Sequence, residues 1–158
     1  MRRKDREVTD SAKIQDVINR CTCCRIGFND HGQVYIVPLN FGYEYVQDKY
    51  TLYFHGAKEG RKVDLIQSAP DVGFEMDTDY VLKTPDSDIA CKCSARFQSV
   101  TGNGVVQMVT ESEEKQHGLS LIMEHNTGKR DWIFEENMLR AVAVFKLEVT
   151  ELSCKQHE

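Results

Sequence analysis

The chain has 158 residues, of which 41% are hydrophobic and 28% charged, with only 3 prolines. This length allows one domain with a real hydrophobic core, and the composition carries no signature of disorder. The net charge of −5 argues against a nucleic-acid partner. The basic start, residues 2–4, is followed at once by Asp5 and Glu7, which predicts a solvated N-terminal segment.

No apolar run approaches the length that spans a bilayer, and no apolar segment follows the N-terminal charges as in a signal peptide. We therefore expect a cytoplasmic protein with no membrane partner and with mostly reduced cysteines. The cysteines cluster as C-x-C-C at 21–24 and C-x-C at 91–93, whereas zinc sites usually pair two C-x(2–4)-C knuckles. No metal site is expected, and the thiols are interpreted as buried or half-buried.

The first predicted element is a helix that Thr9 or Asp10 can cap. Its apolar side chains recur at i, i+3, i+4 and i+7: Ile14, Val17, Ile18 and Cys21. A strand over 25–28 and a turn over 29–32 precede a long β-prone stretch at 34–43. Pro38 cannot donate a ladder hydrogen bond, so it marks a bulge or an edge.

The middle of the chain alternates turns, strands and one short helix. The expected elements are a turn at 47–49, a strand at 50–55, a loop at 56–60, a helix at 61–68, strands at 72–76 and 80–82, and a polar loop at 83–91. A β-rich stretch follows at 95–109, interrupted by Gly102-Asn103-Gly104. These three residues fit either a hairpin or a bulge in one long strand.

Residues 110–113 have the S/T-x-x-E form of a capping box, which predicts a helix that ends near 126–128. A last strand is expected at 141–149. About six strands separated by short helices, with few long βαβ periods, favour an antiparallel β-barrel with short helices over a doubly wound sheet. Residues 1–158 are interpreted as a single domain, because no repeat, low-complexity tract or linker interrupts them.

Residues 53–66 hold the most informative pattern, a strand that enters a glycine-bearing loop before a short helix. Arg61 and Lys62 stand at the helix start, where free backbone N–H groups and the dipole suit a phosphate. Gly60 allows close backbone approach. The pattern is neither a P-loop nor G-x-G-x-x-G, which counts against nucleotide triphosphates and Rossmann-type binding. Without further information, the pattern fits a phosphate site and a solvated cationic helix face equally well.

Four segments in order resemble the pyridoxamine-phosphate-oxidase-like flavoproteins, and within them the nitroimidazole-resistance branch. They are YIVPLNFGY (35–43), LYFHGAKEGRKVDLI (52–66), DVGFEMD (71–77) and FQSVTGNGVV (97–106). The resemblance implies a split-barrel fold, FMN as cofactor, and a homodimer with two flavin sites between its subunits. It also implies an FMN-dependent oxidoreductase that reduces a small electron-poor substrate of the nitroaromatic kind.

The resemblance also assigns roles to single residues. Arg61 and Lys62 match the basic pair on the FMN phosphate, next to Gly60. The strand that lines the isoalloxazine ring is matched by Val37, Pro38, Leu39 and Asn40. Phe54 and His55 end the neighbouring strand beside the flavin or the substrate. His55 matches a histidine typical of the branch and is the expected catalytic residue, while Ser99 loosely matches a strand that reaches a flavin from the other subunit.

One feature sets a limit to the resemblance. Vitamin B6 oxidation is not expected, because residues 152–155 (LSCK) stand where true oxidases of this family carry a tryptophan and basic residues. Two other functions stay open at this point. One is a non-catalytic flavin-binding protein, and the other is a haem-binding split barrel with His55 as an axial ligand.

Overall fold

The computed structural model describes residues 3–158, and its main element is one antiparallel sheet. The strands are β1 (Glu7–Val8), β2 (Cys24–Asp30), β3 (Gln33–Leu39), β4 (Gly42–Val46), β5 (Lys49–Gly56), β6 (Asp71–Lys83), β7 (Ser94–Met108) and β8 (Ala143–His157). The helices are α1 (Ser11–Arg20), α2 (Arg61–Ser68), α3 (Ser112–Thr127) and α4 (Glu136–Ala141), with short 3-10 turns η1 (Lys4–Arg6) and η2 (Ala90–Lys92). No helix among the described residues is long and apolar enough to cross a membrane.

The strand order is β3-β2-β6-β7-β8-β5-β4, with β1 paired to β8. β3 and β4 lie at opposite edges of this path, yet only Asn40 and Phe41 separate them in the chain. Because three Cα steps span roughly 10 Å, the two edges must approach each other at this end. The sheet therefore curls into a barrel that stays open between β3 and β4. The predicted antiparallel split barrel is confirmed, and Pro38 lies on an edge strand as expected.

The main core fills the inside of the curled sheet. Phe28, Leu52, Phe54 and Phe145 are at most 1% exposed, and the Phe54 and Phe145 rings stack with centroids 5.4 Å apart. Side chains alternate along β5, so Tyr53 points to the other face, where it packs with Leu119 and Ile122 of α3. α3 covers β4 and β5 very closely. A Cβ at Gly42 would lie 2.3 Å from the carbonyl carbon of Leu121, which requires glycine there.

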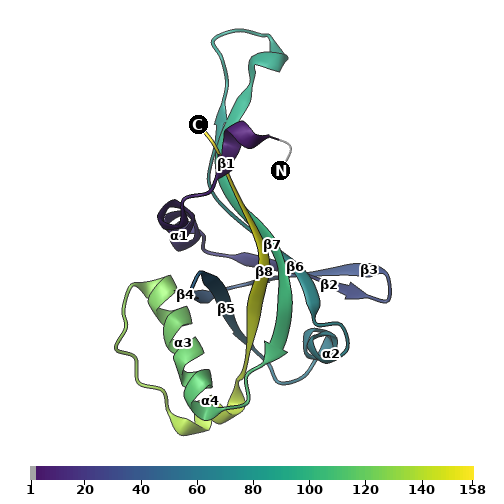
Figure 1. Ribbon diagram of the computed structural model, residues 1–158, viewed down its shortest axis with the longest axis vertical. Helices are drawn as coiled ribbons and strands as arrows, with labels where there is room; N and C mark the ends of the chain where they lie inside the picture. Colours follow the sequence, from purple (N-terminus) through teal and green to yellow (C-terminus); the bar gives the residue numbers. More distant parts are fainter. Residues whose placement is uncertain (1–2) are drawn as a thin grey trace.

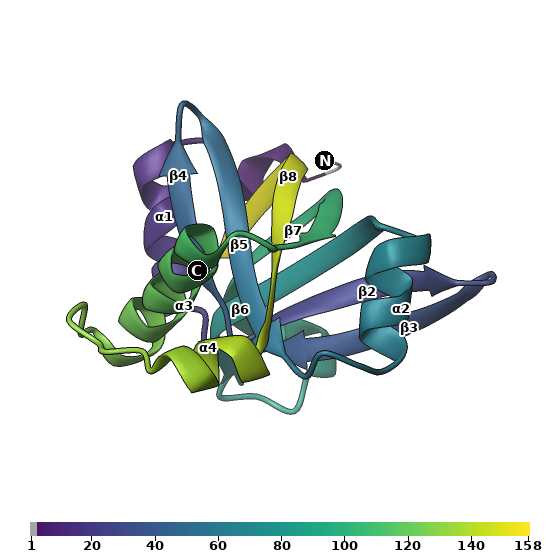
Figure 2. The same ribbon diagram turned by 90° about the horizontal axis from the view of Figure 1, so that it is seen from below.

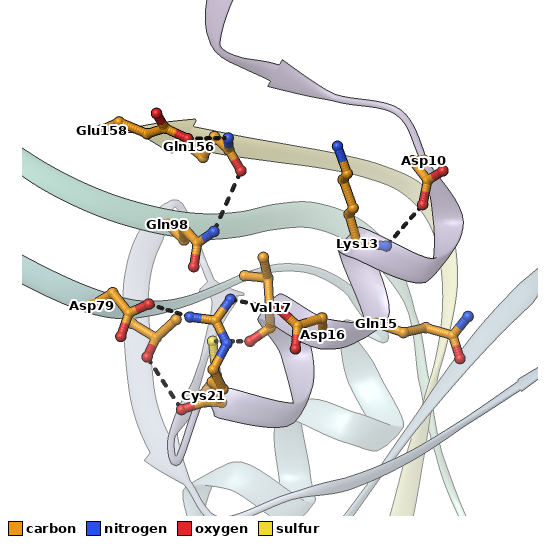
Figure 3. A network of polar contacts seen from close by, with 12 residues as sticks. Asp10, Lys13, Gln15, Asp16, Val17, Cys21, Asp79, Gln98, Gln156 and Glu158 are labelled. Atoms are coloured by element: carbon orange, nitrogen blue, oxygen red, sulfur yellow. Dashed lines mark hydrogen bonds and ion pairs between the residues drawn. The ribbon is translucent and has the colours of Figure 1, made fainter.

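α1 is bound to the sheet at its C-terminal end (Figure 3). Its N-terminus is capped by Asp10, whose carboxylate accepts a hydrogen bond from the Lys13 N–H at 2.9 Å. Arg20 contacts both Asp16 and Asp79, and Thr78 Oγ1 donates to the Arg20 carbonyl. Asp79 has a positive φ of 57°, at the register shift between Thr78 and Val81. Beyond this point β6 and β7 leave the body as a projecting hairpin, which Figure 1 shows at the top.

Several strand boundaries differ from the prediction. The stretches 72–76 and 80–82 form one strand, β6, because β7 pairs with both sides of the irregularity. Gly102-Asn103-Gly104 is not a hairpin but lies within β7, at a register shift against β8. The last strand is longer than predicted and reaches His157, and the stretch 34–43 divides into β3 and β4. The prediction of a capping box at 110–113 is wrong, because Glu111 is the N-cap residue of α3 and its side chain makes no capping hydrogen bond. The sequence also failed to predict α4.

Candidate functional site

The loop between β5 and α2 is the part of the structure that the predicted site occupies. Gly60 precedes α2 with a φ of 117°, a left-handed value that favours glycine, and its carbonyl accepts the Val63 N–H at 2.8 Å. Val63, Leu65 and Ile66 are buried and fix the helix on the body of the protein. Arg61 and Lys62 thus stand at the first turn of a helix whose N-terminal end faces the loop, as predicted.

Arg61 is held in one orientation by two neighbours. Its Nε–H donates a hydrogen bond to Asp30 Oδ2 at 2.7 Å, and its Nη2 lies 2.5 Å from the same carboxylate oxygen. The guanidinium carbon lies 4.3 Å from the ring centroid of Tyr35 on β3. Arg61 keeps about half of its side chain exposed, so its remaining N–H groups are free to bind an anion.

Lys62 reaches back over the end of β5. A Cβ at Gly56 would lie 2.7 Å from Lys62 Nζ, so the glycine makes room for the ammonium group. Nζ also lies 5.0 Å from the ring centroid of Phe145. Partial burial lowers the pKa of Lys62 from its usual value. An anion bound here would restore the solvation that the ammonium group loses, so the position suits a phosphate.

His55 is the penultimate residue of β5, next to these two cations. Its backbone pairs with Val144 of β8, and its side chain is exposed on the face opposite to the buried Phe54. Partial desolvation of the ring, and then the charge of Lys62, lower the pKa of His55 below its usual 6.5. The structure thus brings His55, Gly60, Arg61 and Lys62 into one neighbourhood.

The predicted residues on β3 lie at the open edge of the barrel. Val37 and Leu39 are half-buried against the core, whereas Pro38 and Asn40 are exposed. Val37 shares its face of the strand with Tyr35, which contacts Arg61. This contact connects β3 to the start of α2.

Two predicted site residues are placed differently from the rest. Phe54 is completely buried, so its side chain belongs to the core and only its backbone could contact a ligand. Ser99 on β7 pairs with Asp77 and Lys155. The part of β7 near His55 is the other end of the strand, where Met108 pairs with Phe145, about nine residues from Ser99. This separation is roughly 30 Å along the strand. A single chain therefore does not bring Ser99 to the cations of α2.

The cysteines divide between core and surface. Cys21, Cys24 and Cys154 are buried, Cys23 is half-buried, and Cys91 and Cys93 are exposed. Burial raises the pKa of Cys21 to about 12 and that of Cys154 to about 11, so both stay protonated thiols. Within residues 3–158, no group of three or more His, Cys, Asp or Glu side chains is placed to hold a metal ion.

The chain is a small split-barrel protein that carries two cations, Arg61 and Lys62, at the junction of the β5–α2 loop and α2. The chain belongs to the pyridoxamine 5'-phosphate oxidase family, whose model matches residues 10–156. The resemblance inferred from the sequence is confirmed. No curated protein sequence matches the chain.

Solved structures support the same assignment. A candidate 5-nitroimidazole antibiotic resistance protein from Bacteroides thetaiotaomicron is 30% identical, with a TM-score of 0.81, and the match covers 95% of this chain and 86% of that one. A flavocytochrome from Azotobacter vinelandii is 19% identical (TM-score 0.78), with 100% and 72% covered. An FAD- and haem-binding protein from Mycobacterium smegmatis is 16% identical (TM-score 0.80), with 97% and 74% covered. The last two show the shared fold.

Proposed function

We propose that this protein is an FMN-dependent oxidoreductase that reduces a small electron-poor compound of the nitroaromatic kind. The observation that carries the proposal is the grouping of His55 with Arg61 and Lys62, in which Lys62 is close enough to lower the pKa of His55. A phosphate-binding pair next to a titratable side chain is what a reductase with a phosphorylated cofactor requires. The 30% identity to a candidate 5-nitroimidazole resistance protein supports the substrate class.

Each residue has a distinct part in this proposal. Arg61 offers N–H groups to two phosphate oxygens, and Lys62 supplies a point charge that the missing Cβ of Gly56 admits. Bound flavin would supply the electrons for reduction. Converting a nitro group to a nitroso group takes two electrons and two protons and releases water. His55 is placed to deliver one of these protons.

The spectrum of the purified protein tests the cofactor. We expect flavin absorption bands, with a cofactor released on denaturation that runs as FMN, and no Soret band. After anaerobic reduction with dithionite, addition of a nitroimidazole should restore the oxidised spectrum and give a reduced product. A Soret band would instead indicate a haem protein, and bound flavin that nitroimidazoles fail to reoxidise would indicate a flavin-binding protein without this activity.

A homodimer is part of the same proposal, and an exposed apolar face supports it. On the outside of β3, β2, β6 and β7, Val34 and Ile36 are 76% and 60% exposed, and Val105 is 37% exposed. Gly27 and Gly73 lie between them and leave two shallow hollows of 390 and 380 Å³. We call Val34, Ile36, Val105, Gly27 and Gly73 the apolar face. A second copy of the chain would cover it and enclose the half-open site.

Light scattering tests the dimer. The wild-type protein at micromolar concentration should have twice the 18.1 kDa chain mass. Ile36→Glu should convert it to a monomer, because the interface would then bury an unpaired charge. Val46→Glu is the matched control, since Val46 is 57% exposed on β4, at the other edge of the sheet. A wild-type monomer that binds flavin fully would contradict the dimer, and an unaffected Ile36→Glu dimer would exclude this face.

The six unpaired cysteines support the expected cytoplasmic location, since thiols stay reduced there.

A further inference from the structure

A second group of cations lies beside the β5–α2 loop. Here Lys58, Thr110, Ser112, Lys115, Glu136, Leu139 and Arg140 line a hollow of 510 Å³. These residues come from four segments: the β5–α2 loop, the connection between β7 and α3, the start of α3, and α4. We call this site the cationic hollow. Figure 2 shows α4 beside the end of β5 from which the chain leaves for α2.

The hollow has an excess of positive charge in a chain whose net charge is −5. Three cations line it against one carboxylate, that of Glu136. Arg140 and Glu136 form an ion pair of 3.5 Å, but their side chains are 75% and 85% exposed, so the pair holds them weakly. Burial lowers the pKa of Lys115, and the positive charge of Lys58 lowers it further, because the two ammonium groups repel each other. An anion between them would remove this repulsion.

Among the described residues, no carboxylate of α3 lines the hollow. The carboxylate of Glu114 forms an ion pair with Lys146 on β8, with Oε1 and Nζ 2.7 Å apart, and does not line the hollow. Glu111 accepts a hydrogen bond from the Thr110 hydroxyl at 3.4 Å and makes no capping bond to α3. The hydroxyl of Ser112 completes the polar lining. The hollow thus offers two kinds of oxyanion partner, ammonium or guanidinium groups and hydroxyls.

The position of the hollow connects it to the proposed active site. Lys58 stands in the five-residue loop between His55 and Arg61. The Val109 N–H donates to the Val144 carbonyl at 2.9 Å, and Val144 is the strand partner of His55. The segment that leads into Thr110 is therefore next to the strand pair that carries His55. A molecule bound beside His55 and the β5–α2 loop would therefore lie close to these cations.

We infer that the cationic hollow binds an oxyanionic group, a phosphate, diphosphate or carboxylate, carried by a molecule that lies beside His55. Two sources share this chemistry: the second phosphate of a flavin dinucleotide, or the acidic group of a substrate. The location of the molecule rests on the proposed function, whereas the binding of an oxyanion by the hollow does not.

Titration of the flavin-free protein with inorganic pyrophosphate tests the hollow itself. The amide NMR signals of residues 112–115 should shift, which separates this site from that of Arg61. The double substitution Lys58→Ala/Lys115→Ala should weaken these shifts about ten- to hundredfold in Kd. Lys49→Ala, at an exposed lysine that begins β5 at the strand end opposite to His55, is the matched control. Unchanged affinity in the double variant, or equal loss in the control, would overturn the inference, whether or not the protein binds flavin.

Two further measurements separate the sources. If a flavin dinucleotide is the source, the double variant should lose affinity for FAD and keep its affinity for FMN. If an acidic substrate is the source, both flavin affinities should stay unchanged. The KM for a nitrobenzoate should then rise about tenfold or more, while the KM for a neutral nitro compound stays constant. If neither quantity changes, the hollow has no part in this reaction and the inference is wrong.

Discussion

Replacing Arg61 with alanine is expected to weaken FMN binding about ten- to hundredfold. The substitution removes a charge-assisted contact to phosphate, which contributes about 1.5–3 kcal/mol. It also removes the guanidinium that lies 4.3 Å from the Tyr35 ring, and with it the contact between α2 and β3. Titration of flavin-free wild type and variant, followed by flavin fluorescence, gives the two dissociation constants.

Two variants make this test specific. Arg130→Ala removes an exposed guanidinium from the segment after α3 and should leave FMN affinity unchanged. Asp30→Asn removes the ion pair that orients Arg61 but keeps the guanidinium, so its loss should be smaller than that of Arg61→Ala. Equal FMN affinity in wild type and Arg61→Ala would exclude Arg61 as a phosphate ligand.

Replacing His55 with alanine is expected to slow oxidation of the reduced protein by a nitroimidazole about 10²–10⁴-fold, the usual range of general acid catalysis. FMN affinity should change far less than in Arg61→Ala, since the phosphate contacts remain. Anaerobic stopped-flow absorbance measures the rate, and a flavin titration measures the affinity. An unchanged rate and product with FMN bound would make His55 a packing residue.

The pH dependence offers an independent check on His55. Desolvation and Lys62 lower its pKa below 6.5, so the imidazolium that donates the proton forms only as the pH falls through this lower value. The wild-type rate should therefore rise as the solution is made more acidic below pH 6.5. His55→Gln, which keeps a hydrogen-bonding side chain but cannot titrate, should abolish this rise. Lys62→Gln at saturating FMN should move the rise to higher pH.

Local patterns in the sequence predicted the elements that local interactions determine. The Asp10 cap, the apolar face of α1, and the loop and helix around Gly60 and Arg61 all depend on neighbours within a few residues. Gly102-Asn103-Gly104 could not be assigned in this way, because β8, some 45 residues later, decides between a bulge and a hairpin. Residues 72–76 and 80–82 likewise form one strand because a distant segment, β7, pairs with both of them.

The candidate site also has a part that the local sequence predicts and a part that depends on distant segments. His55, Gly60, Arg61 and Lys62 lie within eight residues of one another, so one motif contains them. The cationic hollow is assembled from residues 58 to 140, and no spacing in the sequence connects Lys58 with Arg140. α4 was missed because it is short and forms through the packing of residues such as Leu139 against the second core, beside Tyr53 and Val144.

The position of β8 has a consequence for the nascent chain. β8 lies between β5 and β7 and also pairs with β1, so it joins three segments that are far apart in the sequence and are all made before it. Until Ala143–His157 leaves the ribosome, the hydrogen-bonding edges of β5 and β7 lack this partner. Such late closure slows folding and leaves strand edges open to aggregation.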